Sequence, residues 1–305
     1  MTYRHPDRSS FYHPYNFVIS TSQSKRLHIA ELERIINSGN ATCITDRIGN
    51  SLTFELLEWD SSFFGRPIYK VHFLSLAANS SLADINGLFD ELFSSFRQPN
   101  IDSYFYIEVP SEDLEILEAI STSGWKLIET RLTYFNPDIS TLGSNVQDQI
   151  RLATIDDIDD LRETAIKARN PFDRFHSDSF FSSEEVDRFM GIFIENSVKG
   201  REHYVVVPKN GPANAFFAGS KVQIDESTVV GRMTLSAVST ERKGWHIDIT
   251  RGLCHYFLQD QIKTVVMTTQ STNRAVLTNL MKLNFKFGRA SHIYSKVLNT
   301  SDMEF

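Results

Sequence analysis

The stretch AVSTERKGWHID, residues 237–248, carries the clearest prediction about the fold of this chain. An apolar run, TVVGRMTLSAV (228–238), leads into it and an amphipathic pattern over 247–260 follows it, so the stretch is predicted to join a strand to a helix. A tight turn before a helix offers unpaired amides and the positive end of the helix dipole. Gly244 allows such a turn to bring its backbone close to a ligand. The stretch is therefore predicted to be a tight strand-to-helix turn.

The sequence on both sides of this turn predicts an α/β (α+β) fold with a mixed sheet. Thr154 with Asp157 three positions later is typical of a helix start, and a second helix is expected over 183–197. The order strand, helix, helix, three strands, helix, strand, helix, strand favours helices on both faces of the sheet. The other predicted elements are strands 150–153, 203–208, 215–224, 228–238, 264–269 and 290–298 and helices 247–260 and 273–283.

The first half of the chain is predicted to form a smaller α/β domain. Its helices are expected at 24–38, 82–96 and 112–121, and its strands at 51–59, 67–74, 104–109 and 126–135. The segment 136–149 is rich in Asn, Ser, Gly and Asp, which is typical of a linker. The expected organisation is an irregular arm 1–20, an N-terminal domain 21–139, a linker 140–149, a C-terminal domain 150–299 and a tail 300–305.

The two halves echo one another at an offset of 160 residues (284 − 124). This offset places Gly124-Trp125-Lys126 on Asn284-Phe285-Lys286 and Tyr134 on Tyr294. Both halves are therefore predicted to end in strand, helix, turn and strand. Amphipathic units of this kind also match by chance, so the sequence leaves duplication and coincidence equally open.

Composition excludes several classes of function. A formal net charge of −7 argues against nucleic acid or an anionic membrane as partner, and no run approaches the roughly 18 apolar residues that a bilayer span needs. Only Cys43 and Cys254 are present, so neither a disulfide framework nor a metal site is expected. We expect a cytoplasmic protein. The sequence contains no nucleophile elbow, phosphate-binding P-loop or His-Glu-x-x-His motif.

The element order of 150–299 resembles the GNAT acyltransferase superfamily, and the stretches 237–248 and 273–285 resemble its cofactor-binding motifs. The segments LEWDSSFFG (57–65), DRFHSDSFF (173–181) and FIENSVKG (193–200) are similar to dTDP-fucosamine (dTDP-4-amino-4,6-dideoxygalactose) N-acetyltransferases. The resemblance implies a mixed-sheet GNAT fold in the C-terminal half, preceded by a domain that is partly GNAT-like. It also implies acetyl-CoA, or another acyl-CoA, as co-substrate.

The resemblance assigns the turn after Val238 to the diphosphate of coenzyme A. Lys243 stands where the superfamily usually has Arg or Gln, and Gly244 fits a glycine of the motif. His246 and Asp248 replace two small residues, and a carboxylate at a helix start repels phosphate. The implied cofactor-binding residues are Ala237, Val238, Lys243, Gly244, Trp245, His246, Ile247, Asn273 and Leu280.

Two of these positions bear on catalysis. Asn273 could hold the pantetheine arm of the cofactor, cap the following helix, or do both. Leu280 stands where the superfamily has a tyrosine that protonates the leaving thiolate, and it cannot donate a proton. Losing a general acid slows a reaction by about 10²–10⁴-fold. Tyr294 is the nearest substitute, although an aromatic on this strand is also typical of core.

The loop RNPFDRFHSD, residues 169–178, is expected to bind the acceptor. Arg169 and Arg174 could hold the diphosphate of a sugar nucleotide, with Phe175 beside them, or could form local ion pairs on a solvated loop. His176 titrates near neutrality when unperturbed and could accept the proton of the amine, but it could equally be an exposed loop residue.

Two functions from different classes remain open on this sequence. The first is an acyl-CoA-dependent N-acyltransferase that acetylates a small-molecule amine, such as a nucleotide-linked amino sugar. The second is a GNAT-like binding or structural protein that has lost turnover, which the residues around His246 and Leu280 favour. For either function, the sequence leaves undecided whether two chains form a homodimer by pairing of edge strands.

Overall fold

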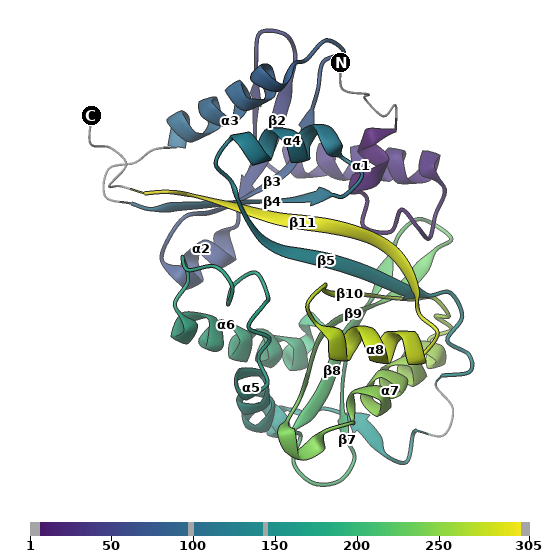
Figure 1. Cartoon of the computed structure of the whole chain (residues 1–305). Coiled ribbons are helices and arrows are strands. Elements are labelled where there is room, and N and C mark those ends of the chain that lie inside the picture. The colour runs from purple at the N-terminus through teal and green to yellow at the C-terminus, as the bar shows by residue number, and fades with distance from the viewer. Residues whose placement is uncertain (1–6, 97–100, 143–145, 300–305) are drawn as a thin grey trace. The chain divides into compact units, whose positions relative to one another are not determined.

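The computed structural model describes residues 7–96, 101–142 and 146–299 (Figure 1). Its internal contacts divide the chain into two units. Unit 1 comprises residues up to Thr130 and those from Arg289 onward, and unit 2 comprises Arg131–Gly288. The expected tail 300–305, the first six residues of the expected arm and residues 143–145 of the expected linker lie outside the described residues.

Unit 2 is built on a mixed sheet in the order β5-β10-β9-β8-β7-β6. The strands are β5 (Lys126–Asn136), β6 (Ile150–Leu152), β7 (Tyr204–Pro208), β8 (Ala215–Gln223), β9 (Val229–Val238) and β10 (Val265–Gln270). One face is covered by α7 (His246–Gln259) and α8 (Arg274–Lys282) through a core that includes Leu253 and Leu280. The other face is covered by α5 (Ile158–Lys167) and α6 (Ser183–Asn196) through Leu161 and Ile194.

The strands of unit 1 follow the order β1-β2-β3-β4-β11 and include parallel and antiparallel pairs. The strands are β1 (Ala41–Thr45), β2 (Ser51–Leu56), β3 (Ile68–Ser75), β4 (Ser103–Pro110) and β11 (Lys286–Leu298). The helices α3 (Leu82–Phe96) and α4 (Leu114–Thr122) pack on one face, where Phe89 and Ile116 are fully buried. The helix α1 (Thr21–Asn37) places His28 against Phe73 of β3, with ring centroids 4.9 Å apart. The short α2 (Glu58–Phe64) joins β2 to β3.

β5 ends the first half of the chain but pairs in unit 2, and β11 ends the second half but pairs in unit 1. β5 pairs antiparallel with β10 from Arg131↔Gln270 to Asn136↔Val265, and β11 pairs antiparallel with β4 from Ser291↔Pro110 onward. The chain thus enters unit 2 within β5 and returns to unit 1 within β11. The expected linker 140–149 falls inside unit 2, where Leu142 and Val146 are buried in the core. The domain boundaries expected from composition stay a prediction.

The two units repeat one another at the predicted offset. α4 and α8 begin and end 160 residues apart (274 − 114 and 282 − 122). After these helices, Gly124 and Asn284 both take positive φ, at 69° and 58°. The next residues, Trp125 and Phe285, are both buried. Equal spacing, equal turn geometry and equal burial favour a repeated architecture over a chance match.

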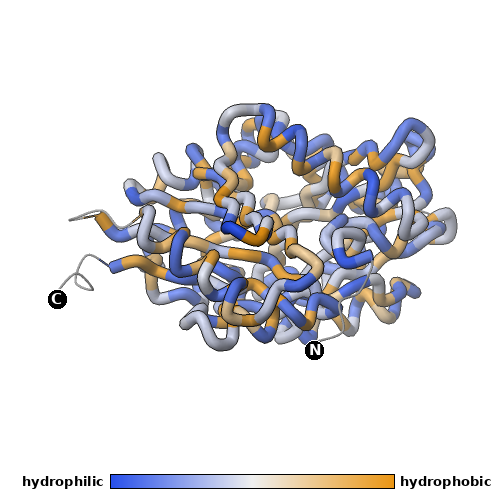
Figure 2. Tube along the Cα trace, turned by 90° about the horizontal axis from the view of Figure 1, so that it is seen from above, coloured by the Kyte–Doolittle hydropathy of each residue, from blue (hydrophilic) through white to orange (hydrophobic). Residues whose placement is uncertain are grey.

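The helix starts follow the capping residues in the sequence. Ser20 and Ser182 form capping boxes with Gln23 and Glu185, and Thr154 forms one with Asp157 at the 3₁₀ turn before α5. Figure 2 shows apolar residues in short stretches that alternate with polar ones. Within the part of the chain that the structure describes, no helix is both long and apolar enough to cross a bilayer.

Candidate functional site

The sheet of unit 2 opens between β9 and β10. The two strands are parallel and pair from Val265↔Gly231 to Met267↔Met233, but β9 continues to Val238 and β10 to Gln270. The pairing ends at a bulge, because Ala218 of β8 faces Leu235 whereas Gly219 faces Met233. A bulge adds one residue to a strand and bends it, which separates it from its neighbour. The end of β9 therefore presents an edge that β10 does not cover.

Of the backbone amides of Ala237 and Val238, two of the implied cofactor-binding residues, one lies on this open edge. β9 stays paired with β8 to its end, and Ser239 N–H donates to Asn214 O at 2.9 Å. Since N–H groups alternate along a strand, Ala237 N–H also faces β8 and Val238 N–H faces the uncovered edge. The Ala237 side chain packs in the core towards α5. Of the two predicted amides, Val238 is thus the one available to a ligand.

The turn after β9 is the predicted strand-to-helix connection. It comprises a 3₁₀ turn (Thr240–Arg242), Gly244 at φ 100° and α7. Trp245 occupies the N-cap without a side-chain hydrogen bond to the helix, so the first amides of α7 receive no cap from it. Lys243 and Gly244 are exposed, whereas Ile247 packs against the core. The start of α7 therefore lacks a side-chain cap from Trp245, and Lys243 is exposed in the turn just before it.

Arg242 fixes the shape of this turn. Its Nε donates to Asn214 Oδ1 at 3.0 Å and a terminal nitrogen donates to Asn210 O at 2.9 Å. The guanidinium carbon lies 4.6 Å from the centre of the Trp245 ring. Trp245 is thus held by Arg242 and also packs against the core of unit 2. The local sequence pattern did not point to Arg242, because its partners come from the distant β7–β8 connection.

His246 points into the layer between α7 and the sheet. Its Nε2 lies 3.4 Å from Ser236 Oγ, and its ring centroid lies 5.6 Å from that of Phe217. Burial lowers the pKa of His246 to about 4, so the ring is neutral at pH 7. It contributes no positive charge to the turn. Asp248, in the first turn of α7, contributes a negative one.

Asn273 and Leu280 on α8 have structural surroundings. Asn273 Oδ1 accepts from Val276 N–H at 3.3 Å and its Nδ2 donates to Thr269 Oγ1 at 3.2 Å, so Asn273 caps the helix. Leu280 is completely buried in the core of unit 2. The position expected to hold a general acid is therefore apolar and enclosed.

His176 is held by two carboxylates. Its Nδ1 lies 2.6 Å from Asp173 Oδ2 and its Nε2 lies 3.4 Å from Asp187 Oδ1. Burial opposes a charge on this ring, but the hydrogen bonds to Asp173 and Asp187 outweigh it and raise the pKa of His176. Both ring nitrogens face carboxylate oxygens, so neither is available to accept a proton from an amine. Arg169 completes the cluster, with its guanidinium 2.7 Å from Asp187 Oδ2.

The predicted acceptor loop is attached to the end of β10. Asn170 Nδ2 donates to Gln270 Oε1 at 2.6 Å, next to the open stretch of β10. The Arg174 guanidinium stacks 4.2 Å from the centre of the Phe175 ring, and Phe175 is buried against Phe181. The structure thus brings this loop to the same unit as β9, α7 and α8. Tyr294 lies in unit 1, where it pairs with Ile107 and packs against that core.

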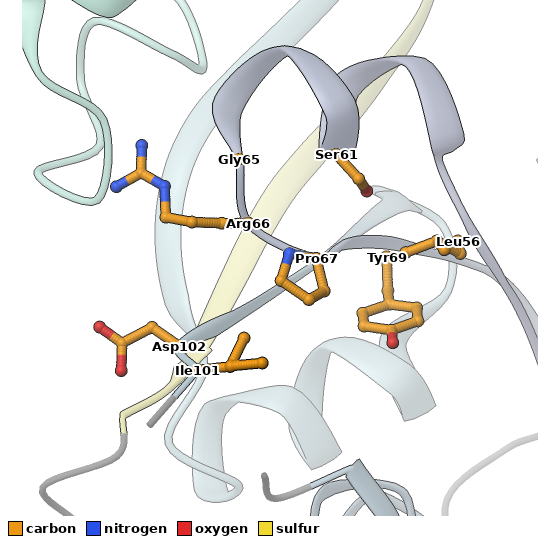
Figure 3. A pocket seen from close by; sticks show the side chains of 8 residues that line it. All are labelled: Leu56, Ser61, Gly65, Arg66, Pro67, Tyr69, Ile101 and Asp102. Carbon is orange, nitrogen blue, oxygen red and sulfur yellow. The ribbon is translucent and has the colours of Figure 1, made fainter. Parts of the chain in front are cut away.

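Unit 1 contains a surface hollow of about 590 Å³ that the sequence did not predict (Figure 3). It lies where β3 and β4 begin, and Gly65, at the C-cap of α2 with φ 65°, forms part of its wall. Trp59 of α2 is 42% exposed. The residues that line the hollow are Leu56, Ser61, Gly65, Arg66, Pro67, Tyr69, Ile101 and Asp102.

Comparisons with known proteins identify the fold. No protein-family model matches the sequence, and a search of curated proteins gives no significant match. A GCN5-related N-acetyltransferase from Sphaerobacter thermophilus is similar at a TM-score of 0.55 and 9% identity, over 87% of this chain and 85% of that one. A tandem GNAT protein from the clavulanic acid biosynthesis pathway is similar at a TM-score of 0.53 and 14% identity, over 81% of this chain and 78% of that one. A GCN5-related N-acetyltransferase from Kribbella flavida is similar at a TM-score of 0.52 and 10% identity, over 88% of this chain and 95% of that one.

At these identities the similarity shows the fold alone. The predicted fold class is confirmed: the chain has a mixed-sheet α/β fold similar to that of GNAT proteins.

Proposed function

We propose that unit 2 is an N-acyltransferase that takes its acyl group from acyl-coenzyme A. The observation that carries this proposal is the parting of β9 from β10 after Met233↔Met267, which leaves Val238 N–H facing an uncovered edge. The uncapped start of α7 and the exposed Lys243 support it, because amides and a cation favour the cofactor's diphosphate. The GNAT fold agrees with this use of the site.

The reaction requires positioning more than side-chain chemistry. Val238 N–H donates to the thioester carbonyl oxygen, where negative charge develops as a neutral amine attacks. The new C–N bond forms, the C–S bond breaks, coenzyme A leaves as thiolate, and the nitrogen loses one proton. Leu280 cannot protonate the thiolate and His176 has both ring nitrogens engaged, so solvent accepts and supplies the protons. Catalysis rests on proximity and on the amide.

The proposed acceptor is an amine carried by a small molecule, such as a nucleotide-linked amino sugar. The support is the attachment of the loop 169–178 to the end of β10 through Asn170 and Gln270. Arg169 is 42% exposed at its side chain and shares Asp187 with His176, so it keeps donors for an anionic group. This acceptor is also what the resemblance of 57–65 and 173–181 implies.

A second candidate is a GNAT-like binding or structural protein without turnover. The specific observation in its favour is the enclosed, apolar Leu280 at the position of the expected acid. Asp248 in the first turn of α7 adds to it, since it repels the diphosphate. The two candidates differ in whether an acyl group leaves the bound donor.

Two measurements test the proposal. A ligand at 100 times its dissociation constant adds about 2.7 kcal/mol to stability, so acetyl-CoA should raise the melting temperature by several degrees. Release of free thiol from acetyl-CoA in the presence of amino-sugar nucleotides then measures transfer. No shift at millimolar acetyl-CoA contradicts the acyltransferase and supports the second candidate, and so does a shift without thiol release with any amine.

A proline at the open edge tests the amide itself. Val238→Pro removes the N–H that faces the gap, and Val238→Ala is the matched control that keeps it. Loss of one oxyanion donor costs about 10²–10³-fold in kcat. We expect that loss in Val238→Pro alone, with binding of desulfo-coenzyme A unchanged. Equal kcat in the two variants would show that this amide does not stabilise the transition state.

A further inference from the structure

Unit 1 contains the same opened pair of strands as unit 2. β3 and β4 are parallel and pair from Ile68↔Tyr104 to Val71↔Ile107, and β3 then continues to Ser75. The pairing again ends at a bulge, because Thr53 of β2 faces Phe73 whereas Phe54 faces Val71. The end of β3 therefore also has an edge that β4 does not cover.

An arginine from the N-terminal segment fills this edge. The 3₁₀ helix Arg8–Tyr12 (η1) places the Arg8 guanidinium against the carbonyl oxygen of Leu74, to which it donates a hydrogen bond. Arg8 Nε lies 2.8 and 2.9 Å from the two carboxylate oxygens of Asp113. Arg8 is 8% exposed and Asp113 is 3% exposed. The open backbone of β3 is thus bonded to a buried, paired cation.

The partner of Arg8 occupies the same position in unit 1 as Asn273 does in unit 2. Asp113 is the N-cap residue of α4, as Asn273 is of α8. Its carboxylate also accepts from Tyr12 OH at 2.6 Å. A carboxylate at this position recognises a guanidinium, whereas the neutral Asn273 does not.

Other elements of unit 1 hold the rest of the segment. Ser24 of α1 donates to Ser10 O at 2.7 Å, and Arg289 of β11 donates to His13 O at 3.2 Å. The Arg8 guanidinium carbon lies 4.8 Å from the centre of the Phe73 ring. Backbone and side chains of the segment are both recognised, which is typical of a bound peptide.

The loop after β3 lacks what a diphosphate needs. Residues 75–96 contain no Lys or Arg. Asn50 Oδ1 accepts from Ala77 N–H at 2.7 Å, and Ser81 caps α3 with Asp84. The amides and charges that favour an anion in unit 2 are therefore engaged or missing in unit 1.

We propose that the open end of β3 is a binding groove for an arginine-bearing peptide, filled in this chain by its own segment Arg8–Tyr12. Unit 1 then uses the strand opening to hold a peptide, whereas unit 2 uses it for the acyl donor of the proposed function. Each chain accordingly binds one molecule of acyl-CoA.

Hydrogen exchange of the full chain tests the groove without any cofactor. Arg8→Ala should speed exchange of the amides of 72–75 and 114–117 by at least about tenfold, while α7 and β9 stay unchanged. Arg34→Ala is the matched control, since Arg34 is an exposed arginine of α1 paired with Glu31. Tyr12→Phe, which keeps Arg8, should give a smaller acceleration at the same amides.

A peptide added in trans separates recognition from general packing. A synthetic peptide with the sequence of residues 7–19 should restore slow exchange at 72–75 in the Arg8→Ala chain, and the same peptide carrying Arg8→Ala should not. Unchanged exchange in the variant, acceleration spread evenly over β2 and α3, or failure of the native peptide to restore protection would each overturn the proposal. Calorimetry should give one acetyl-CoA per chain before and after Arg8→Ala, and two after it would also overturn the proposal.

Discussion

At the scale of single residues, opposing charges decide how well the turn after β9 can hold a diphosphate. Lys243 is exposed just before α7, and Asp248 lies in its first turn. A helix start carries a partial positive charge that an anion shares with any carboxylate nearby. The sequence alone revealed this conflict, because it depends on residue type and spacing.

Replacing Asp248 should therefore tighten binding of acyl-CoA. We expect Asp248→Asn to lower the Kd about 2–5-fold at low salt, since a charge at a helix start is worth about 0.3–1 kcal/mol. The gain should shrink in high salt, where exposed charges are screened. Titration calorimetry at two salt concentrations measures it. Glu226→Gln, in the exposed turn before β9, is the control, and an equal gain there would show a general charge effect.

Two substitutions distinguish the two possible roles of Asn273, as the cap of α8 and as a ligand of the cofactor. Asn273→Ala should lower the free energy of unfolding by about 1 kcal/mol, because α8 loses its cap. Asn273→Asp keeps an oxygen for Val276 N–H and should keep stability and the Kd for acetyl-CoA within about twofold. Denaturant unfolding and calorimetry give the two values. A normal stability with a tenfold weaker Kd in Asn273→Asp would instead show that the amide binds the cofactor.

At the scale of elements, the local sequence pattern predicted most helices and strands, because the spacing of apolar residues and the helix-capping residues act over only a few positions. α3 has the predicted bounds, and α6 begins at the predicted Ser183. The bulges in β3 and β9 were not predicted, because they depend on register against β2 and β8. The candidate site of unit 2 and the proposed groove of unit 1 lie at those bulges. Their most informative geometry was therefore beyond the reach of the sequence pattern.

The packing of α1 and the N-terminal segment makes unit 1 sensitive to acid. Burial lowers the pKa of His13 and His28 to about 4 and that of His72 to about 3. An unfolded His titrates near pH 6.5, so below that pH the unfolded chain binds protons that the folded chain does not. Stability is lost as the pH falls from 6.5 toward 4.

Unit 1 should lose about 2 kcal/mol per ring between pH 6.5 and pH 5. Hydrogen exchange of β3, corrected for the intrinsic exchange rate, measures the loss. His28→Gln should reduce the loss of stability by the share of one histidine. His255→Gln, on α7 of unit 2, should not change the slope in unit 1. His176 in unit 2 has the opposite sign, because its raised pKa stabilises the fold in acid. A flat profile in unit 1 would contradict burial as the cause of the lowered pKa values.

At the scale of the whole molecule, the exchange of last strands sets what can fold alone. β5 pairs along all six residues of β10, yet it precedes the expected domain 150–299. Pairing between segments so far apart in sequence follows no local signal, which is why composition pointed to 140–149 as the boundary. The same distance explains why Tyr294, 14 residues after Leu280, belongs to unit 1 (294 − 280).

Two fragments test this assignment. Residues 150–299 lack β5 and leave β10 with a long uncovered edge, so we expect low soluble yield and no cooperative melt. Residues 126–288 keep the strands and helices of unit 2 and should melt cooperatively. Circular dichroism on both fragments gives the answer. A cooperative melt of 150–299 equal to that of 126–288 would support the boundary expected from the sequence.

The strand exchange also fixes when the protein can mature on the ribosome. β5 emerges about 130 residues before its partner β10, which at about 5–20 residues per second means a delay of roughly 6–26 s. β4 waits longer still, because β11 begins 176 residues after β4 ends (286 − 110). During these delays β4 and β5 each lack a pairing partner. An unpaired strand edge can pair with another chain, so both strands are exposed to misassembly until their partners have been made.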